Sequence, residues 1–382
     1  MTATTRTTES TASEGTLYLA FELGSTKWTL GFTIGSAQRP RVRTIAAGDL
    51  RALEQEILKA KARFGLVLAA PVRSCYEAGR EGFWLHRWLI AQAIANLVVD
   101  SSSIEVARKA RRAKTDRLDV RKLLAQLLRW VGGESKVWSV VHVPTPAAED
   151  ARQLTREMDT VRADRTRVRT RIQALLATQG VRLSLDRHFE GALTRIATGD
   201  GRPFPEALRA RLWREWTHLM QIDARLAALE TARAAHITEG RDHVAIVARR
   251  LITLRGVGDA SAATFSAELF GTRTFQNPRQ LGALTGLVPV PYRSDQRVQD
   301  QGISKAGRGS VRALAIQIAW CWRRWQPESA LTQWFERRFA PAGKRARRIG
   351  IVALARKLII ALWRYVEHGV LPEGARLTST RA

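Results

Sequence analysis

Four carboxylates in the first third of the chain occupy positions where metal-assisted chemistry could use them. Glu22 lies inside an apolar segment, where a carboxylate costs several kcal/mol unless it is paired or binds a metal. Glu77 follows the apolar run at residues 66–70, near the carboxyl end of an expected strand. Asp116 and Asp119 are three residues apart, so both lie on one side of a helix start.

Carboxylates that converge from two strands and a helix would hold one or two divalent cations. Ligation by oxygen alone favours Mg²⁺ or Mn²⁺. Each residue also has a structural interpretation: Asp116 could complement the helix dipole, and Glu77 could pair with Arg73 or Arg80. Taken together in a basic protein, the four carboxylates indicate metal-assisted phosphodiester chemistry.

The elements expected to position these carboxylates alternate between strands and helices over the first 131 residues. We expect strands at 17–23, 28–34, 41–46, 66–70 and 97–99, and helices at about 49–63, 82–96 and 115–131. This order predicts an α/β domain over residues 16–135, with a mixed sheet covered by helices. Residues 1–15 are rich in Thr and Ser and are expected to form a disordered tail.

The middle of the chain shows a heptad pattern. Small or apolar residues recur in steps of three and four from Ala151 to Leu175, interrupted by Arg165, within an expected helix at 147–179. A second apolar seam runs from Leu208 to Leu229, after a break at 199–203. The pattern predicts a coiled-coil hairpin over 147–240, and an ordinary helical bundle is the alternative.

The last third, residues 242–375, is expected to be mostly helical. Residues 254–260 resemble the turn of a helix-hairpin-helix, in which glycines bring backbone N–H groups close to a phosphate. Glycines and prolines mark a loop from about 282 to 309, and helices are expected at 310–325 and 348–366.

The charge balance indicates a polyanionic partner. The chain has 382 residues, with 62 Lys and Arg against 35 Asp and Glu, for a formal net charge of +27. Nucleic acid is the leading candidate, because Arg binds phosphate bidentately and each contact releases counterions. Cys75 and Cys321 are the two cysteines and lie far apart, which excludes a disulfide scaffold and a CxxC zinc site. Apolar runs are too short to span a bilayer, so no membrane is expected.

Six segments carry a resemblance that extends from about residue 17 to 375. They are Phe21-Glu22-Leu23, Tyr76-Glu77-Ala78-Gly79, and the stretches 113–119, 285–294, 301–307 and 351–358. In this order they resemble the DEDD-type insertion-sequence transposases of the IS-one-ten family. That family includes a pilin-gene invertase and the RNA-guided bridge recombinases.

The resemblance implies a RuvC-like N-terminal domain of the RNase H fold, a coiled coil, and a C-terminal helical domain with a nucleophilic serine. It assigns the metal-binding positions to Glu22, Glu77, Asp116 and Asp119, and the nucleophile to Ser294. The chain departs from the family pattern at two places. Glu22 stands where the family usually has Asp, and Asp295 stands where it usually has Gly.

The implied activity is site-specific DNA recombination through a phosphoserine link, with Mg²⁺ or Mn²⁺ at the carboxylates. The implied partners are DNA, a structured guide RNA and further copies of the chain in a dimer or tetramer, in the bacterial cytoplasm. A decayed nucleic-acid-binding protein and a RuvC-type nuclease are the alternatives. The candidate nucleic-acid contacts are basic residues in four clusters: Arg108, Arg111, Arg112 and Lys114; Arg162, Arg165, Arg169 and Arg171; Lys305 and Arg308; and Lys344, Arg345, Arg347 and Arg348.

Overall fold

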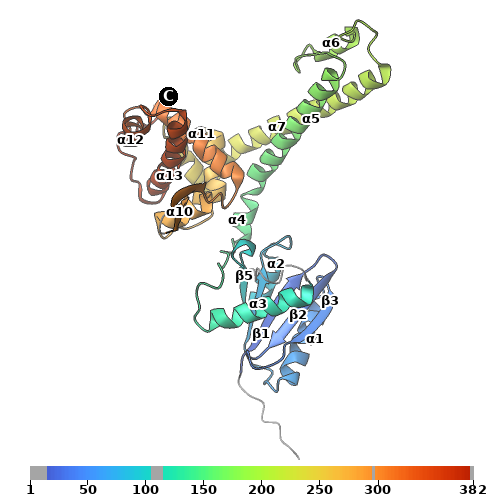
Figure 1. The fold of residues 1–382 in the computed structure, drawn as a ribbon, viewed down its shortest axis with the longest axis vertical. Coiled ribbons are helices and arrows are strands. Elements are labelled where there is room, and N and C mark those ends of the chain that lie inside the picture. The colour runs from blue at the N-terminus through green and yellow to red at the C-terminus, as the bar shows by residue number, and fades with distance from the viewer. Residues whose placement is uncertain (1–14, 105–114, 295–296, 379–382) are drawn as a thin grey trace, which may run out of the picture. The chain divides into compact units, whose positions relative to one another are not determined.

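A computed structural model describes residues 15–104, 115–294 and 297–378, and for 291–294 and 297–301 it describes the backbone alone. The chain divides into two units, Met1–Val143 and Pro144–Ala382, which are described separately (Figure 1). Across the described ranges, no helix has the length and apolarity needed to cross a membrane.

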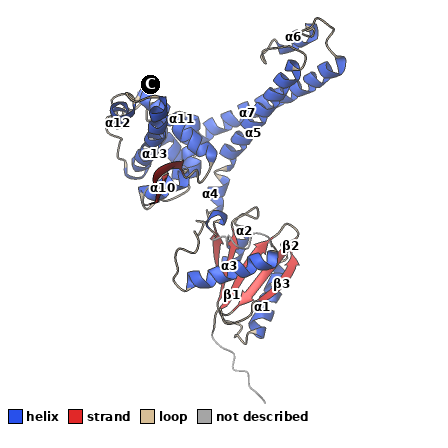
Figure 2. Cartoon of the chain, in the orientation of Figure 1, coloured by secondary structure: helices blue, strands red, loops and turns tan. Residues whose placement is uncertain are grey.

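The first unit is a five-stranded mixed sheet with helices (Figure 2). Its strands are β1 (Leu17–Leu23), β2 (Lys27–Thr33), β3 (Arg41–Ala46), β4 (Val72–Glu77) and β5 (Ala95–Val99), in the order β3-β2-β1-β4-β5. β2 pairs antiparallel with β1 and β3, whereas β1, β4 and β5 are parallel. The helices are α1 (Leu50–Arg63), α2 (Trp84–Ala91), the 3-10 turn η1 (Ser101–Ser103) and α3 (Asp116–Val131).

Alternation along β1 divides the buried residues of this unit between two faces of the sheet. Leu17, Leu19 and Phe21 belong to a cluster that includes residues of α1 and α2, whereas Ala20 packs with residues of α3. α3 approaches β2 closely, because a Cβ at Gly31 would lie 2.4 Å from Val120 Cγ1. The predicted α/β domain with a mixed, helix-covered sheet is therefore confirmed.

The prediction of a strand at 66–70 is wrong. These residues form a turn after α1 in which Leu68 is 74% exposed, and the strand begins after Pro71 as β4. The Leu17 amide donates to the Pro71 carbonyl (2.9 Å), which brings the chain into register with β1. Glu77 is consequently the last residue of β4. The helix expected at 82–96 is also shorter, because α2 spans Trp84–Ala91 and β5 begins at Ala95.

The middle of the chain forms two long helices packed side by side (Figure 1). The elements are α4 (Pro146–Asp150), α5 (Gln153–Ala177), α6 (Phe189–Arg195) and α7 (Glu206–Glu239), so the helix expected at 147–179 is interrupted at 151–152. Buried side chains of the expected seams form one cluster between α5 and α7: Val161, Val168 and Ile172 from α5, and Leu212, Leu219 and Ile222 from α7.

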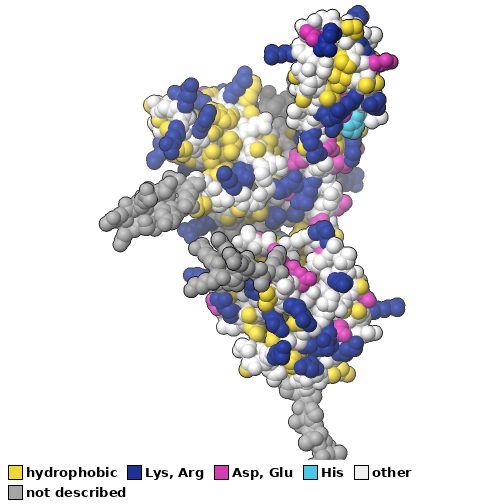
Figure 3. Space-filling model, turned by 45° about the vertical axis from the view of Figure 1, so that its right-hand side comes forward, with side chains coloured by type: hydrophobic (Ala, Val, Ile, Leu, Met, Phe, Trp, Pro, Cys, Tyr) yellow, Lys and Arg dark blue, Asp and Glu magenta, His cyan; other side chains and the backbone are white. Residues whose placement is uncertain are grey.

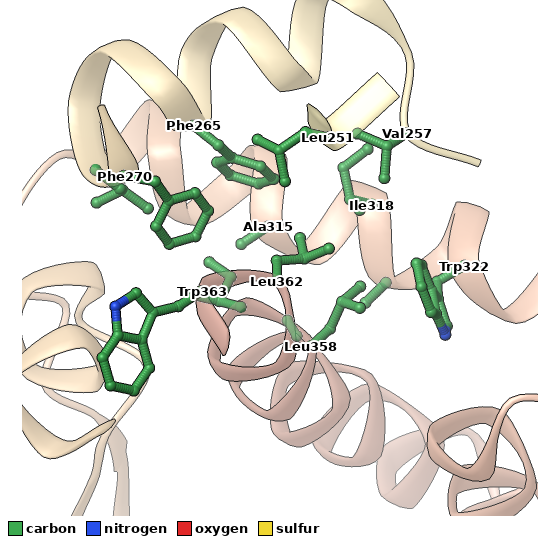
Figure 4. Packing of buried hydrophobic residues seen from close by; sticks show 14 of the residues in the cluster. Leu251, Val257, Phe265, Phe270, Ala315, Ile318, Trp322, Leu358, Leu362 and Trp363 are labelled. Atoms are coloured by element: carbon green, nitrogen blue, oxygen red, sulfur yellow. The ribbon is translucent and has the colours of Figure 1, made fainter. Parts of the chain in front are cut away.

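The C-terminal part is a helical core with one β-hairpin. It comprises α8 (His243–Ile252), α9 (Asp259–Phe265), the π-helical turn η2 (Ser266–Phe270), α10 (Pro278–Thr285), β6 (Pro289–Ser294), β7 (Arg297–Ile303), α11 (Gly309–Trp325), α12 (Ala330–Phe339) and α13 (Lys344–His368). Figure 4 shows Leu358 and Leu362 of α13 packing toward residues of α8, α9 and α11.

The loop expected at 282–309 is not a loop throughout. α10 ends at Thr285 and is capped by Gly286, which adopts a left-handed φ of +66°, and an antiparallel β6–β7 hairpin follows. Pro289 and Pro291 were part of the reason for predicting a loop. Both are tolerated in β6, because this strand belongs to a two-stranded sheet and its register is irregular between the two prolines. The turn at 254–260 does connect two helices, α8 and α9. Its Gly256 packs against α11, since a Cβ there would lie 3.2 Å from Trp325 Cβ.

A buried carboxylate in η2 ties α5 to the C-terminal core. Glu268 is 5% exposed and accepts two hydrogen bonds from Arg156 of α5, at 2.9 and 3.2 Å. It also accepts a 2.7 Å bond from Arg308, which directly precedes α11 and donates a second bond to Asp159 (2.9 Å). Three segments far apart in sequence therefore depend on one side chain.

We predict that Glu268→Gln lowers the free energy of unfolding by about 2–4 kcal/mol, because two partly buried arginines lose their shared anion. The matched control is Glu328→Gln, whose ion pair with Arg376 is exposed on both sides and should change stability by less than about 0.5 kcal/mol. Urea unfolding followed by circular dichroism measures both. Equal losses in the two variants would contradict the central role of Glu268.

Candidate functional site

Two of the predicted carboxylates lie next to each other at the carboxyl edge of the parallel strands. The register pairs Phe21 of β1 with Tyr76 of β4, so Glu22 and Glu77 are the next residues on adjacent parallel strands. Neighbouring strands lie about 4.8 Å apart. Glu22 is half-buried and Glu77 is exposed. The residues two positions earlier, Ala20 and Cys75, pack in the α3 cluster, so alternation places both glutamates on the face of the sheet that α3 covers.

The two aspartates lie in the first turn of α3, on that same face. Thr115 caps the helix by accepting a hydrogen bond from the Leu118 amide (3.4 Å). α3 packs on the sheet through Val120, opposite Gly31, and through the Leu123 carbonyl, which lies 3.9 Å from Cys75 Sγ. Asp116 is exposed, and Asp119 is half-buried.

Asp119 has an unsatisfied oxygen. Its Oδ2 is buried and has no hydrogen-bond partner among the described residues. An unpaired buried carboxylate oxygen is costly and favours a cation or a donor at that position. Within the described ranges, however, no three Asp, Glu, His or Cys side chains are close enough to hold a metal ion together. The structure thus brings the carboxylates to one face of the sheet without assembling them into a closed metal site.

Ser294 is the last residue of β6, where its backbone pairs with Arg297 of β7. The opposite end of the hairpin is held against the C-terminus of α10. The Ser304 amide donates to the Val288 carbonyl (2.9 Å), and the Lys305 amide donates to the Gly286 carbonyl (3.1 Å). These bonds fix the base of the strand that carries Ser294.

Close backbone contacts make this base rigid. A Cβ at Gly307 would lie 2.0 Å from the Leu284 carbonyl oxygen, and one at Gly286 would lie 2.3 Å from the Ala306 oxygen. Arg312 of α11 donates to that same Ala306 oxygen (2.9 Å). The hairpin is therefore anchored to both α10 and α11.

The predicted basic clusters differ in how many of their residues are already paired. Arg108, Arg111, Arg112 and Lys114 lie outside the described residues. In the second cluster, three arginines of α5 pair with acids of α7: Arg162 with Glu230 (3.6 Å), Arg165 with Asp223 (2.5 Å) and Arg171 with Glu215 (2.9 Å). Arg169 has no ion pair within the described ranges. These pairs run in antiparallel register and flank the apolar seam, so they hold the two helices together.

The remaining basic residues also fall into two groups. Arg308 is engaged by Glu268 and Asp159, and Arg347 donates to the Ala340 carbonyl at 3.0 and 2.7 Å. Four others form no ion pair with any described residue: Lys305, Lys344, Arg345 and Arg348. All four are exposed.

Two cations that the candidate contacts did not include extend the last group. A groove beside α13 is lined by Arg356 and Lys357, together with Arg345 and Arg348 of the same helix and Trp334 of α12. Helical spacing was the available signal, because residues 345, 348, 352 and 356 recur at three- and four-residue intervals on one face of α13.

The comparisons with known proteins match both the C-terminal part and the whole chain. The sequence profile described as the transposase IS116/IS110/IS902 family matches residues 248–333, which include Glu268 and Ser294. "Putative transposase y4rJ" of Sinorhizobium fredii is 38% identical over 374 residues, which cover 94% of each chain. The chain belongs to this transposase family.

A more distant relative supports the same assignment. The transposase for insertion sequence element IS1328 of Yersinia enterocolitica is 27% identical over 183 residues, covering 47% of this chain and 52% of that protein. The function of an insertion-sequence transposase, with DNA as a partner, follows from membership of the family.

We predict that Gly307→Ala is far more damaging to the transposase than Gly302→Ala. Both glycines have positive φ, +65° and +83°, and each substitution incurs the backbone cost of about 1–2 kcal/mol. Only Gly307 also faces a close backbone oxygen, whereas a Cβ at Gly302 meets nothing within 4 Å. Thermal unfolding and amide exchange across residues 284–312 measure the difference. Similar exchange rates in the two variants would show that the hairpin base is not tightly seated.

Proposed function

We propose that this transposase cuts and rejoins DNA through a phosphoserine intermediate formed by Ser294, assisted by a divalent cation at the carboxylates of the sheet. The supporting observation is the register of the parallel strands, which makes Glu22 and Glu77 neighbours on the face that carries Asp116 and Asp119. This placement supports the RuvC-like assignment, as does a sheet of three antiparallel strands extended by two parallel ones.

Oxygen ligands fit Mg²⁺ or Mn²⁺, and the buried, unsatisfied Asp119 Oδ2 supports a cation at this position. When bound, such an ion would neutralise charge on a phosphate. The residues that would hold it are Glu22, Glu77, Asp116 and Asp119. Glu22 is one methylene longer than the aspartate usual in the family, and this extra length changes its reach while the charge stays the same.

In the chemistry proposed for Ser294, each phosphodiester bond that breaks is replaced by another. Its hydroxyl oxygen forms a bond to phosphorus as the bond from phosphorus to one DNA oxygen breaks. The serine proton leaves, and the departing DNA oxygen gains a proton. Attack by the hydroxyl of another DNA end reverses these changes, joins the new strands and restores the serine. Rejoining therefore needs no external energy source, in contrast to hydrolysis by a RuvC-type nuclease.

Ser294 and the carboxylates belong to different units of the chain. We propose a composite site assembled in a dimer or tetramer, with the α5–α7 pair as a coiled coil. A structured guide RNA is proposed as a further partner, because a net charge of +27 exceeds what a short DNA contact requires. All of these contacts would form where the DNA is found, in the cytoplasm.

We predict that Ser294→Ala abolishes covalent protein–DNA adducts while DNA binding remains within about two-fold of wild type. The substitution removes the atom that would bond to phosphorus and leaves the charge unchanged. A denaturing gel of labelled DNA that retains protein-linked strands is the measurement, with Ser304→Ala as the matched control. Normal adducts from Ser294→Ala would disprove the assignment. Free cleaved ends without adducts from the wild type would favour a nuclease, and neither product would favour a decayed protein.

We also predict that Mn²⁺ raises the melting temperature of the wild type and that Asp119→Asn removes this shift. Without metal, Asp119→Asn should melt at the wild-type temperature or above, because a buried oxygen loses its uncompensated charge. Glu54→Gln in α1 is the control, an exposed carboxylate that forms no ion pair in the described structure. Thermal scans with MnCl₂ and with EDTA measure the shift. An unchanged Mn²⁺ shift in Asp119→Asn would exclude this residue from the metal site.

A further inference from the structure

A groove of about 760 Å³ lies between the base of the β6–β7 hairpin and helix α13. Its volume falls within the range of about 300–1,000 Å³ that is usual for small-ligand sites. The wall is mostly apolar. It includes Leu287, Pro289 and Ile303 at the base of the hairpin, and Ile349, Val352 and Ile360 from α13. Ile349 is 58% exposed, so part of this apolar wall is open to solvent.

The polar lining of the groove is cationic. Arg345, Arg348, Arg356 and Lys357 contribute to it, and none of the lining side chains that the structure describes is acidic. Arg356 Nε is buried and has no hydrogen-bond partner among the described residues. Gly282 of α10 faces this guanidinium, and a Cβ there would lie 3.4 Å from Nε. An unpaired, partly buried guanidinium that lines an open groove favours an anionic occupant.

An aromatic ring completes the site. Trp334 of α12 lines the groove, and Lys357 Nζ lies 4.7 Å from the centroid of its ring. Phe339 packs edge-on against the same indole at 5.4 Å and holds it in place. Apolar walls, an indole and several cations together suit a flat, weakly polar group attached to phosphates.

We propose that this groove binds an unpaired nucleotide of single-stranded DNA, with the base against the apolar wall and its flanking phosphates on Arg348 and Arg356. The DNA assignment rests on the proposed function, because strand exchange frees DNA ends from their duplex partners. A base that is paired and stacked inside a duplex exposes its edges but not its ring faces, and would leave the apolar wall uncovered. A second copy of this basic chain would bring like charge to four cations that have no carboxylate partner among the described residues.

The position of the groove suits strand exchange. Pro289 lines it and begins β6, and Ser294 ends the same strand five residues later. At about 3.4 Å per residue, the strand spans roughly 17 Å between them. A single strand of DNA held in the groove could therefore run along the hairpin toward the serine.

The test measures binding of the full-length protein to a fluorescent 20-nucleotide DNA, single-stranded and as a duplex, in EDTA. We expect Arg356→Met and Arg348→Met each to weaken single-strand binding by about ten-fold. Each should also lower the slope of log affinity against log salt by about 0.7, with less than three-fold loss for the duplex. Arg348 is exposed, so its variant tests the groove without a risk to folding. Arg364→Met, an exposed residue of α13 outside the groove, should bind as the wild type does.

The proposal is overturned if both groove variants bind the single strand with wild-type affinity, or if they weaken duplex binding equally. It is also overturned if RNA of the same sequence binds more tightly in a groove-dependent way, or if the variants change only the oligomer mass. Binding is measured in EDTA, where metal-dependent cleavage does not take place. If the wild type forms no serine adducts in the cleavage assay, the proposed mechanism is refuted, but the binding measured here is not affected.

Discussion

The buried Glu268 carboxylate is the interaction on which the arrangement of the second unit depends. Arg156 brings the base of α5 to it, and Arg308 brings the residue that precedes α11. Burial lowers the pKa of nearby Arg152 and of Arg273, because removal from water disfavours the charged guanidinium. The hydrogen bonds that Arg156 donates to Glu268 raise the pKa of Arg156. Glu268 therefore offsets the charge of the arginines around it and fixes the N-terminal part of α5 relative to the segment that leads into α11.

Local patterns predicted the bounds of several elements. The observed bounds of β1, β3, α1 and α3 agree with the expected ones within about a residue, and Thr115, where the third helix was expected to begin, is the N-cap of α3. The failures came where a long-range partner decided the outcome. β4 has polar residues at Arg73 and Ser74, yet it is a central strand because β1 and β5 pair with it on both sides. Its apolar neighbour at 66–70 forms no strand of the sheets that the structure describes.

The candidate site was predictable in residue type and only partly in arrangement. The sequence indicated oxygen ligands near strand ends, but the adjacency of Glu22 and Glu77 requires the register of β1 with β4, which no local pattern contains. Likewise, Arg162 and Arg165 were expected to contact nucleic acid, whereas in the structure both pair with acids of α7. The partners lie roughly 60 residues away, a separation that hides such pairs from sequence inspection.

The ion pairs divide the basic residues into those that join helices and those that can bind a ligand. Lys and Arg side chains lie over both units on the face shown in Figure 3, but charge alone does not separate structural arginines from arginines that can bind a ligand. In the second unit, acids are placed beside the arginines that join helices, as at Arg165 and Arg308. Along α13, Arg345, Arg348 and Arg356 have no carboxylate partner among the described residues and border an apolar groove instead. The repulsion between these cations is not offset by any described acidic residue. A polyanion that occupies the groove would relieve this repulsion, and the relief would contribute to the free energy of binding.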